Sequence, residues 1–337
     1  MRRIGRVLAL ILSVFLLLLV VGPFLFPVPP LEGTVPPESL ADPDSRFAEI
    51  GGLKIHYKTA GRGEPAFILL HGFGASVYSW QAVMQPLGRG GTVLAYDRPA
   101  FGLTERPMAW EGRNPYGPDA NVDLLLQMMD QFGFRQAILI GNSAGGTLAM
   151  NFALAHRERV LALILVDPAV YGGGPPSWLS PFLTLPQVRH LGPLIARQIK
   201  TRGLELLRMA WHDPSKITPA MEDAYTKPLR VDNWDLALWY LTVAGSDTGV
   251  ARRLDEFTPP VLVITGDDDR IVPTEQSVRL AGELPSAELS VIPDAGHVPH
   301  EEQPEAFLQA VGEFLQSSFP ELFANGLPGL FSGLTCY

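Results

Sequence analysis

Cysteine is almost absent from this chain of 337 residues, which contains a single one, Cys336. One thiol forms no disulfide within the chain and no cysteine-rich metal site, so a disulfide-stapled domain is excluded. Charge is also sparse: charged residues make up 18% of the chain, and the formal net charge is −9. There is no basic stripe, so the sequence argues against a nucleic-acid partner.

The sequence also lacks internal repeats and any recognisable cofactor or metal motif. The three consecutive aspartates at 267–269 do not have the spacing of a calcium-binding loop. We therefore expect no cofactor and no metal, and a small molecule as the partner. The length allows one large or two small domains, and the high apolar fraction of 47% allows a sizeable core. The oligomeric state is not indicated.

A long apolar run lies near the amino terminus. Residues 7–26 contain no charged side chain, and a run of this length crosses a bilayer as a helix. Arg2, Arg3 and Arg6 precede it, and the next basic residue is Arg46. The positive-inside rule then predicts a cytoplasmic amino terminus, with the catalytic part of the chain on the outer side of the membrane.

A cleaved secretory signal is the alternative, and it would make the protein a secreted one. No small-x-small cleavage site follows the run; the sequence continues with prolines at 27, 29 and 30, which favours an uncleaved anchor. We assign residues 1–30 to a signal-anchor or transmembrane segment. Residues 31–46 are rich in proline and acidic residues, which predicts a semi-extended linker.

From residue 47 onward, short apolar runs alternate with longer amphipathic ones. This alternation predicts an α/β fold with a mostly parallel sheet and helices on both of its faces. Gly51-Gly52 between the first two runs predicts an antiparallel hairpin at one edge. Eight strands are expected, at 47–50, 54–60, 67–70, 92–96, 137–140, 162–166, 261–265 and 288–292. Helices are expected at 79–87, 118–131, 144–155, 275–284 and 304–317.

The alternation is interrupted between residues 167 and 260, where no core strand is expected. This insertion contains several helix-like and aromatic-rich pieces, so we interpret residues 170–258 as a helical cap over the sheet edge. The core would then comprise residues 47–169 and 259–318. The carboxyl-terminal tail, residues 319–337, receives no predicted role.

The hexapeptide Gly-Asn-Ser-Ala-Gly-Gly at 141–146 is the most informative motif. It matches G-x-S-x-G, and it lies between a predicted strand and a predicted helix. In that context the pattern is typical of a nucleophile elbow, a turn so sharp that glycines are needed beside the serine. Ser143 is therefore the candidate nucleophile.

A serine hydroxyl needs a base within hydrogen-bond reach, and the base needs a carboxylate to orient it. Asp269 follows a predicted strand and is the preferred acid, with Asp267 as the second choice. His297 follows the last strand and is the preferred base, whereas His300 is expected at a pocket rim or on the surface. For the oxyanion, the candidate donors are the backbone N–H groups of Ala144 and Phe73.

With these motifs in place, the chain closely resembles the α/β-hydrolase superfamily, in particular serine-nucleophile members with a helical cap. The matching pieces span about residues 47–318: His71-Gly72-Phe73-Gly74-Ala75-Ser76, Asp97-Arg98-Pro99-Ala100-Phe101-Gly102, the elbow, the acid loop at 266–273, which begins with Gly266, and Gly296-His297. The resemblance implies that Asp269, three residues after the acid-loop glycine, is the catalytic acid. It also implies that Asp97 and Arg98 support the active-site loops.

The resemblance leaves the reaction open, because this fold supports many chemistries. Serine at the elbow argues against the aspartate-nucleophile dehalogenases and epoxide hydrolases. We expect a Ser-His-Asp hydrolase that works through an acyl-enzyme on a small to medium apolar carboxylic ester. The alternative is a carbon–carbon bond hydrolase of a meta-cleavage-type diketone. The Gly-Asn-Ser sequence formed by Asn142 before the serine resembles that group of enzymes. A second alternative is a non-catalytic receptor or scaffold of the same fold.

Overall fold

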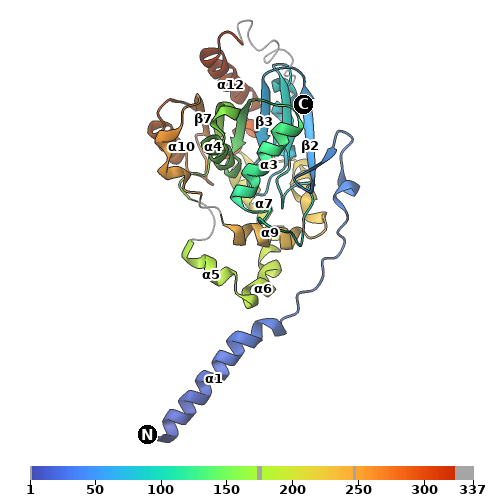
Figure 1. Cartoon of the computed structure of the whole chain (residues 1–337), viewed down its shortest axis with the longest axis vertical. Coiled ribbons are helices and arrows are strands. Elements are labelled where there is room, and N and C mark those ends of the chain that lie inside the picture. The colour runs from blue at the N-terminus through green and yellow to red at the C-terminus, as the bar shows by residue number, and fades with distance from the viewer. Residues whose placement is uncertain (1, 173–176, 246–247, 323–337) are drawn as a thin grey trace.

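The computed structural model describes residues 2–172, 177–245 and 248–322. Its centre is an eight-stranded sheet with the order β1-β2-β4-β3-β5-β6-β7-β8 (Figure 1). The strands are β1 Arg46–Ile50, β2 Leu53–Gly61, β3 Ala66–Leu70, β4 Thr92–Tyr96, β5 Ala137–Asn142, β6 Val160–Val166, β7 Val261–Gly266 and β8 Ala287–Ile292. All eight strands were expected, with bounds that differ by at most two residues.

The sheet is parallel from β4 to β8 and antiparallel at its other edge. β1 and β2 form the hairpin that Gly51-Gly52 predicts, and β2 also pairs antiparallel with β4. The central strands β3 and β5 are buried along their whole length, as expected for parallel strands with both faces covered. The carboxyl ends of the parallel strands therefore meet at one edge of the sheet, where the site lies.

Helices cover both faces of the sheet, as predicted. On one face lie α3 Pro118–Gln131, α4 Ala144–Ala155 and α10 Thr274–Glu283, whose apolar residues share one core cluster with the sheet. On the other face lie α2 Gln81–Leu87 and α12 Pro304–Ser318, which belong to a second cluster. Between these layers the sheet is fixed rigidly enough to position loops at its edge.

The insertion between β6 and β7 is helical in its described parts, and we call these helices the cap. It contains the α-helices α5 Ser180–Leu183, α6 Pro186–Ala196, α7 Ile199–Ala210, α8 Pro219–Thr226 and α9 Trp234–Ala244. Short 3-10 turns, among them η4 Ser177–Leu179 and η6 Lys227–Arg230, connect them. The cap lies below the sheet edge in Figure 1.

The amino-terminal helix α1, Arg2–Leu25, extends away from the rest of the molecule (Figure 1). The most apolar 18-residue window of Arg3–Leu25 has a mean hydropathy of 2.9, and none of this window is buried within the protein. By length and composition this helix fits a transmembrane span. A signal sequence at this position has the same properties.

The segment after α1 is attached to the body more firmly than a semi-extended linker. It contains the 3-10 turn η1, Pro37–Leu40, and Val35 forms a bridge with Val231 of the cap. Asp42 forms ion pairs with Lys58 of β2 and Lys227 of the cap. An acidic residue of the predicted linker therefore attaches the segment to two parts of the protein.

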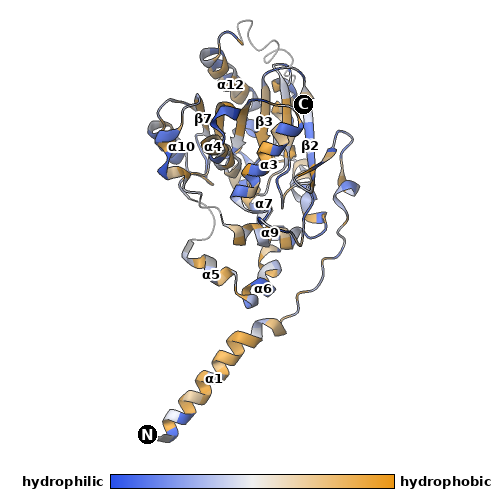
Figure 2. Ribbon diagram, in the orientation of Figure 1, coloured by the Kyte–Doolittle hydropathy of each residue, from blue (hydrophilic) through white to orange (hydrophobic). Residues whose placement is uncertain are grey.

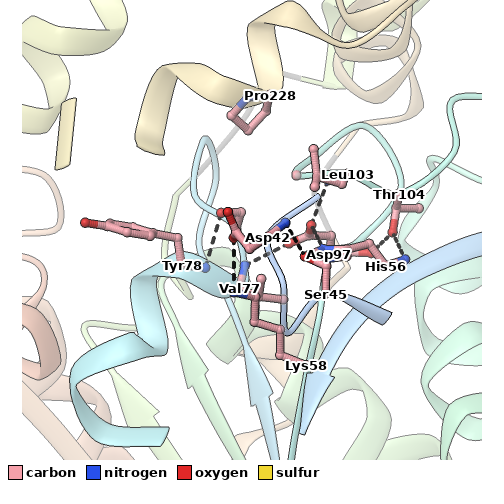
Figure 3. Close-up of polar contacts among 12 residues, drawn as sticks. Asp42, Ser45, His56, Lys58, Val77, Tyr78, Asp97, Leu103, Thr104 and Pro228 are labelled. Atoms are coloured by element: carbon pink, nitrogen blue, oxygen red, sulfur yellow. Dashed lines mark hydrogen bonds and ion pairs between the residues drawn. The ribbon is translucent and has the colours of Figure 1, made fainter. Parts of the chain in front are cut away.

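A buried chain of hydrogen bonds completes this attachment (Figure 3). The Ser45 hydroxyl lies 2.8 Å from His56 Nε2, and His56 Nδ1 lies 2.6 Å from Asp97 Oδ2. The atoms follow the same order as in a catalytic triad, but Asp97 also accepts backbone N–H groups from Val77 and Leu103. We interpret this chain as a structural tie between the linker, β2 and the loop after β4.

Candidate active site

Ser143 lies on the turn between β5 and α4, in the conformation of a nucleophile elbow. Its φ is 52° and its ψ is −118°, a left-handed backbone that a residue with a Cβ rarely adopts. The flanking glycines explain how the turn closes. A Cβ on Gly145 would lie 2.0 Å from the Leu70 carbonyl oxygen, and one on Gly141 would lie 2.4 Å from that of Gly145. The strand and helix approach too closely for any other residue at these positions.

His297 and Asp269 meet at the same sheet edge, from the loops after β8 and β7. His297 Nδ1 lies 2.7 Å from Asp269 Oδ2, and both side chains are buried. The other oxygen of Asp269 accepts the backbone N–H groups of Ile271 at 2.8 Å and Val272 at 2.9 Å. These bonds fix the carboxylate and place the imidazole proton on Nδ1, which leaves Nε2 free to accept a proton.

Asn142 connects this pair to the elbow. Its side-chain amide donates to the main-chain oxygen of His297 at 3.0 Å and to that of Val166 at 3.3 Å. The residue before the nucleophile therefore holds the loop that carries the base. In the sequence, Asn142 served only as a point of resemblance to a family. Its bond to His297 joins residues 155 positions apart, and such a contact leaves no local pattern.

The two other aspartates of the acid loop point elsewhere. Asp267 accepts the backbone N–H of Ala295 at 3.3 Å, and Asp268 pairs with Arg270 and His212. Neither has a recorded bond to the His297 ring. The structure therefore joins His297 to the preferred acid, with Asn142 linking the histidine loop to the residue before Ser143, while Asp267 bonds the backbone of the histidine loop.

Asp167 is a site residue that the sequence reasoning missed. It follows β6 directly and is fully buried, and Thr265 Oγ1 donates to it at 2.7 Å. Burial, followed by the negative charge of Asp269, raises the pKa of Asp167 well above its usual value. The Asp167 carboxyl therefore holds a proton more readily than an exposed aspartate does. The sequence does place Asp167 directly after a predicted strand. The same kind of position led to the choice of Asp269, so this pattern could have identified Asp167 as well.

Asp167, Asp269 and His297 also form a group of potential metal ligands, with one ligand atom from each within 4.8 Å of the others. The hydrogen bonds already described use both oxygens of Asp269 and Nδ1 of His297. A carboxyl of raised pKa beside a carboxylate is typical of two acids that share one proton. The chemistry of the donor set thus fits proton sharing better than a cation.

The loop after β3 lies against the nucleophile. A Cβ on Gly72 would lie 2.7 Å from Asn142 Oδ1 and 3.3 Å from the Ser143 Cβ. Phe73 follows in this loop, and Ala144 is the first residue of α4, where an N–H group has no acceptor within the helix. Both backbone groups remain our candidates for the oxyanion hole.

His71 supports that loop from behind. The Arg98 N–H donates to His71 Nε2 at 3.1 Å, so the ring proton is on Nδ1, which lies 2.8 Å from the Gly72 oxygen. Complete burial, with the positive charge of Arg98, lowers the pKa of His71 to about 3. The imidazole is therefore neutral, and its hydrogen bonds hold the loop. The guanidinium of Arg98 also donates to the main-chain oxygen of His71 at 2.9 Å.

The prediction for His300 is wrong: this residue is fully buried, neither at a rim nor on the surface. Its ring packs against Trp80, and its Nε2 lies 2.8 Å from Ser79 Oγ. Ser79 in turn donates to Glu301 at 2.7 Å, which also accepts a short hydrogen bond from Tyr225 of the cap. Burial lowers the pKa of His300 to about 3 and raises that of Glu301 to about 7.

Glu301 makes a testable contribution to stability. Because its pKa is raised above that of an unfolded glutamate, the folded protein holds a proton that the unfolded chain releases between pH 4.5 and 7. Stability from this group therefore falls as the pH rises through that window. In Glu301→Gln the amide oxygen still accepts from Ser79 and Tyr225, and no charge is buried.

We expect Glu301→Gln to be more stable than the wild type at pH 8, by an amount on the order of 3 kcal/mol, and to lose this advantage by pH 5. Denaturant unfolding at the two pH values measures the difference. Glu313→Gln, on the surface of α12, is the control. A difference that does not change with pH would contradict the assigned ionisation.

The cap is bonded to the loop that carries the base. The His297 N–H donates to the main-chain oxygen of Ala210, the last residue of α7, at 2.7 Å. The Glu302 carboxylate accepts backbone N–H groups from His212 and Asp213 of the cap, each at 2.8 Å, and from Gly296 at 2.9 Å. Three hydrogen bonds thus join these two segments, and the bond from Gly296 to Glu302 fixes the histidine loop itself.

Apolar side chains surround the base on the cap side. Trp211 and Val298 are buried in one cluster with Leu207 and Ala210, and Ile271 packs against it. On the other side of the elbow, Phe101 packs edge-on against both His71 and Phe73. The immediate surroundings of the site therefore favour an uncharged, apolar substrate group.

Comparison with known proteins identifies the class that this fold and site define. A family model described as the alpha/beta hydrolase fold matches residues 65–304, about seven-tenths of the chain. The protein belongs to the α/β-hydrolase family and is a hydrolase.

Three relatives show the range within that family. The chain is 31% identical to a 2-hydroxy-6-oxononadienedioate/2-hydroxy-6-oxononatrienedioate hydrolase of Burkholderia vietnamiensis, over 78% of this chain and 91% of the relative. It is 30% identical to a 2-hydroxy-6-oxo-6-phenylhexa-2,4-dienoate hydrolase of Burkholderia cepacia, over 79% and 92%. The crystal structure of a membrane phospholipase A, a bacterial virulence factor, matches with 25% identity and a TM-score of 0.63, over 94% and 99%.

Proposed function

We propose that this protein is a serine hydrolase in which Ser143 attacks a substrate carbonyl, with His297 as base and Asp269 as the orienting acid. The observation that carries the proposal is the conjunction of a strained Ser143 backbone with the 2.7 Å bond between His297 and Asp269, joined through Asn142. Nucleophilic catalysis needs a nucleophile, a base and a group that orients the base, and Ser143, His297 and Asp269 are suited to these three roles.

The mechanism follows from these positions. His297 Nε2 takes the proton of Ser143 as its oxygen attacks the carbonyl, and Asp269 stabilises the charged imidazole. The N–H groups of Phe73 and Ala144 stabilise the oxyanion. His297 then gives its proton to the leaving group, and water hydrolyses the acyl-enzyme by the same route.

We propose a carboxylic ester with an apolar acyl group as the substrate. The apolar side chains around His297 and Phe73 support this choice, because a charged group there would lose hydration without a partner. Arg98, the cation next to the loop after β3, uses its guanidinium on main-chain oxygens. The similarity to the membrane phospholipase, which extends over 94% of this chain, also supports an ester.

Carbon–carbon bond cleavage is the second candidate, and the curated relatives favour it over ester hydrolysis. By their names, one relative hydrolyses a 2-hydroxy-6-oxo dienedioate or trienedioate and the other a 2-hydroxy-6-oxo dienoate, at 31% and 30% identity over more than nine-tenths of their own length. The same three residues serve this reaction, with a ketone carbonyl as the target of Ser143 and a carbon atom that receives the proton.

We also propose that α1 anchors the protein in a membrane, with the hydrolase on the outer side. The length and mean hydropathy of α1 support a span, and the three arginines that precede the apolar run support this orientation. If the segment is cleaved, the protein is secreted instead.

A direct comparison of the two chemistries tests the proposal. We expect the full-length protein in detergent to hydrolyse p-nitrophenyl esters, with kcat/KM rising at least 10-fold from acetate to a medium-chain acyl group. A 2-hydroxy-6-oxo-6-phenylhexa-2,4-dienoate is the matched second substrate. A kcat/KM that is higher for the dienoate than for every ester would reverse the order of the two candidates.

A further inference from the structure

The cap exposes large apolar side chains where α5 meets α6. Trp178 is 69% exposed, Phe182 54% and Leu185 45%, although soluble surfaces seldom group such residues. Ile195, at the end of α6, is 53% exposed. We call Trp178, Phe182, Leu185 and Ile195 the cap rim. In Figure 2 the helices α5 and α6 lie at the end of the body nearest α1.

The cap rim is fixed at a definite height along the anchor. Gln187 of α6 donates to the Val20 oxygen at 3.3 Å, and His190 Nε2 lies 3.0 Å from that of Phe26. Phe24 also packs against His190, with ring centroids 5.4 Å apart. Helix α6 therefore lies beside the last turns of α1.

This height can be converted into a depth in the bilayer. Residues 7–26 form a helical length of about 30 Å, equal to the hydrocarbon thickness, so Phe26 would mark its outer boundary. Val20 then lies about 9 Å below Phe26. Because Gln187 reaches Val20, the start of α6 would lie at the level of the acyl boundary, where interfacial helices are embedded by about 5–10 Å.

The part of the cap that carries the cap rim is positively charged, whereas the whole chain is negatively charged. Residues 177–210 contain five basic residues and one acidic residue, although the chain carries a net charge of −9. Arg189, Lys200 and Arg202 are exposed. Exposed aromatic and aliphatic side chains combined with local positive charge are typical of surfaces that bind anionic lipid.

We propose that the cap rim is a second membrane contact, which embeds α5 and the start of α6 in the anionic lipid surface beside the anchor. The catalytic domain then does not move freely on a tether, and the cap side of the active site faces the bilayer. On the proposed ester hydrolysis, this orientation favours amphipathic esters that reside in the membrane.

Site-specific fluorescence on the full-length protein in vesicles of phosphatidylcholine and phosphatidylglycerol tests the contact. In a Cys336→Ser background, Phe182→Cys is labelled with an environment-sensitive dye. Val278→Cys on α10, a position that is 44% exposed and far along the chain from the cap, is the matched control. We expect nitroxide-labelled lipid to quench the dye at 182 at least threefold more than at 278, and aqueous iodide to show the opposite order. Equal iodide access at both positions would overturn the proposal.

A triple variant provides the functional measurement. Trp178→Ser, Phe182→Ser and Leu185→Ser together leave the anchor and the catalytic residues intact. We expect turnover of a vesicle-resident ester to fall about 10-fold while a water-soluble ester is hydrolysed at the wild-type rate. An unchanged rate on the vesicle-resident ester would contradict membrane contact by the cap rim. If no ester is hydrolysed at all, the proposed function fails, and lipid quenching still tests the contact.

Discussion

Replacing Ser143 with alanine is expected to lower kcat/KM by about 10⁴- to 10⁶-fold, the range that follows loss of the nucleophile in serine hydrolases. The remaining activity would come from the oxyanion donors and from substrate binding, which the change leaves in place. The variant should fold normally, because alanine removes one hydroxyl and tolerates the turn no worse than serine. Steady-state kinetics on the preferred ester measure the loss.

Ser317→Ala is the matched control, because Ser317 lies on the surface of α12. The wild-type enzyme should also show a burst of p-nitrophenol when hydrolysis of the acyl-enzyme limits the rate, and Ser143→Ala should show none. Retention of more than a tenth of the wild-type kcat/KM by Ser143→Ala, with an unchanged melting temperature, would remove Ser143 from the mechanism.

The second large effect concerns the two buried acids. Asp269→Asn is expected to reduce kcat by about 10³- to 10⁴-fold, because an amide that donates to the ring favours the wrong tautomer of His297. Asp167→Asn is expected to cost less than about 10-fold. The raised pKa of Asp167 favours its neutral form, which asparagine resembles, and an asparagine oxygen still accepts the hydrogen bonds of Thr265 and Gly266.

Asp267→Asn completes the series as a control within the same loop. It should retain activity within about threefold, since Asp267 is bonded to the Ala295 backbone and has no recorded bond to the ring. A loss in Asp267→Asn with an active Asp269→Asn would transfer the role of acid to Asp267. A loss confined to Asp167→Asn would transfer it to the end of β6.

Much of the fold and part of the site follow from short-range patterns in the sequence. The strands are short apolar runs, and α3 and α4 have the same bounds in the structure as in the prediction. The elbow is local too, since glycines at 141 and 145 are required by atoms within the same turn or the strand beside it. Chain order then placed Asp269 and His297 at the ends of neighbouring strands, where the structure joins them.

Other features depend on contacts between distant segments and could not be predicted. His300 is three residues from His297, yet its burial results from packing on Trp80 and Ser79, more than 200 positions away. The raised pKa of Asp167 results first from its burial and then from the negative charge of Asp269, and composition reveals neither. The linker was expected to be semi-extended, and its ion pairs with lysines of β2 and the cap were not foreseen.

The hydrogen bonds between Glu302, Gly296 and the end of α7 restrict how this protein can recombine with its relatives. Exchange of the cap between relatives that share this core is a route to a new substrate specificity. Here a transplanted cap would also have to supply the carbonyl that Ala210 offers to His297 and the two amides that Glu302 accepts. If the transplanted segment ends before Ala210, the histidine loop keeps its own partners at residues 210–213. If it ends after Asp213, those partners are replaced by donor residues. New substrate ranges should therefore arise more readily by change in α5 and α6 than by replacement of the whole cap.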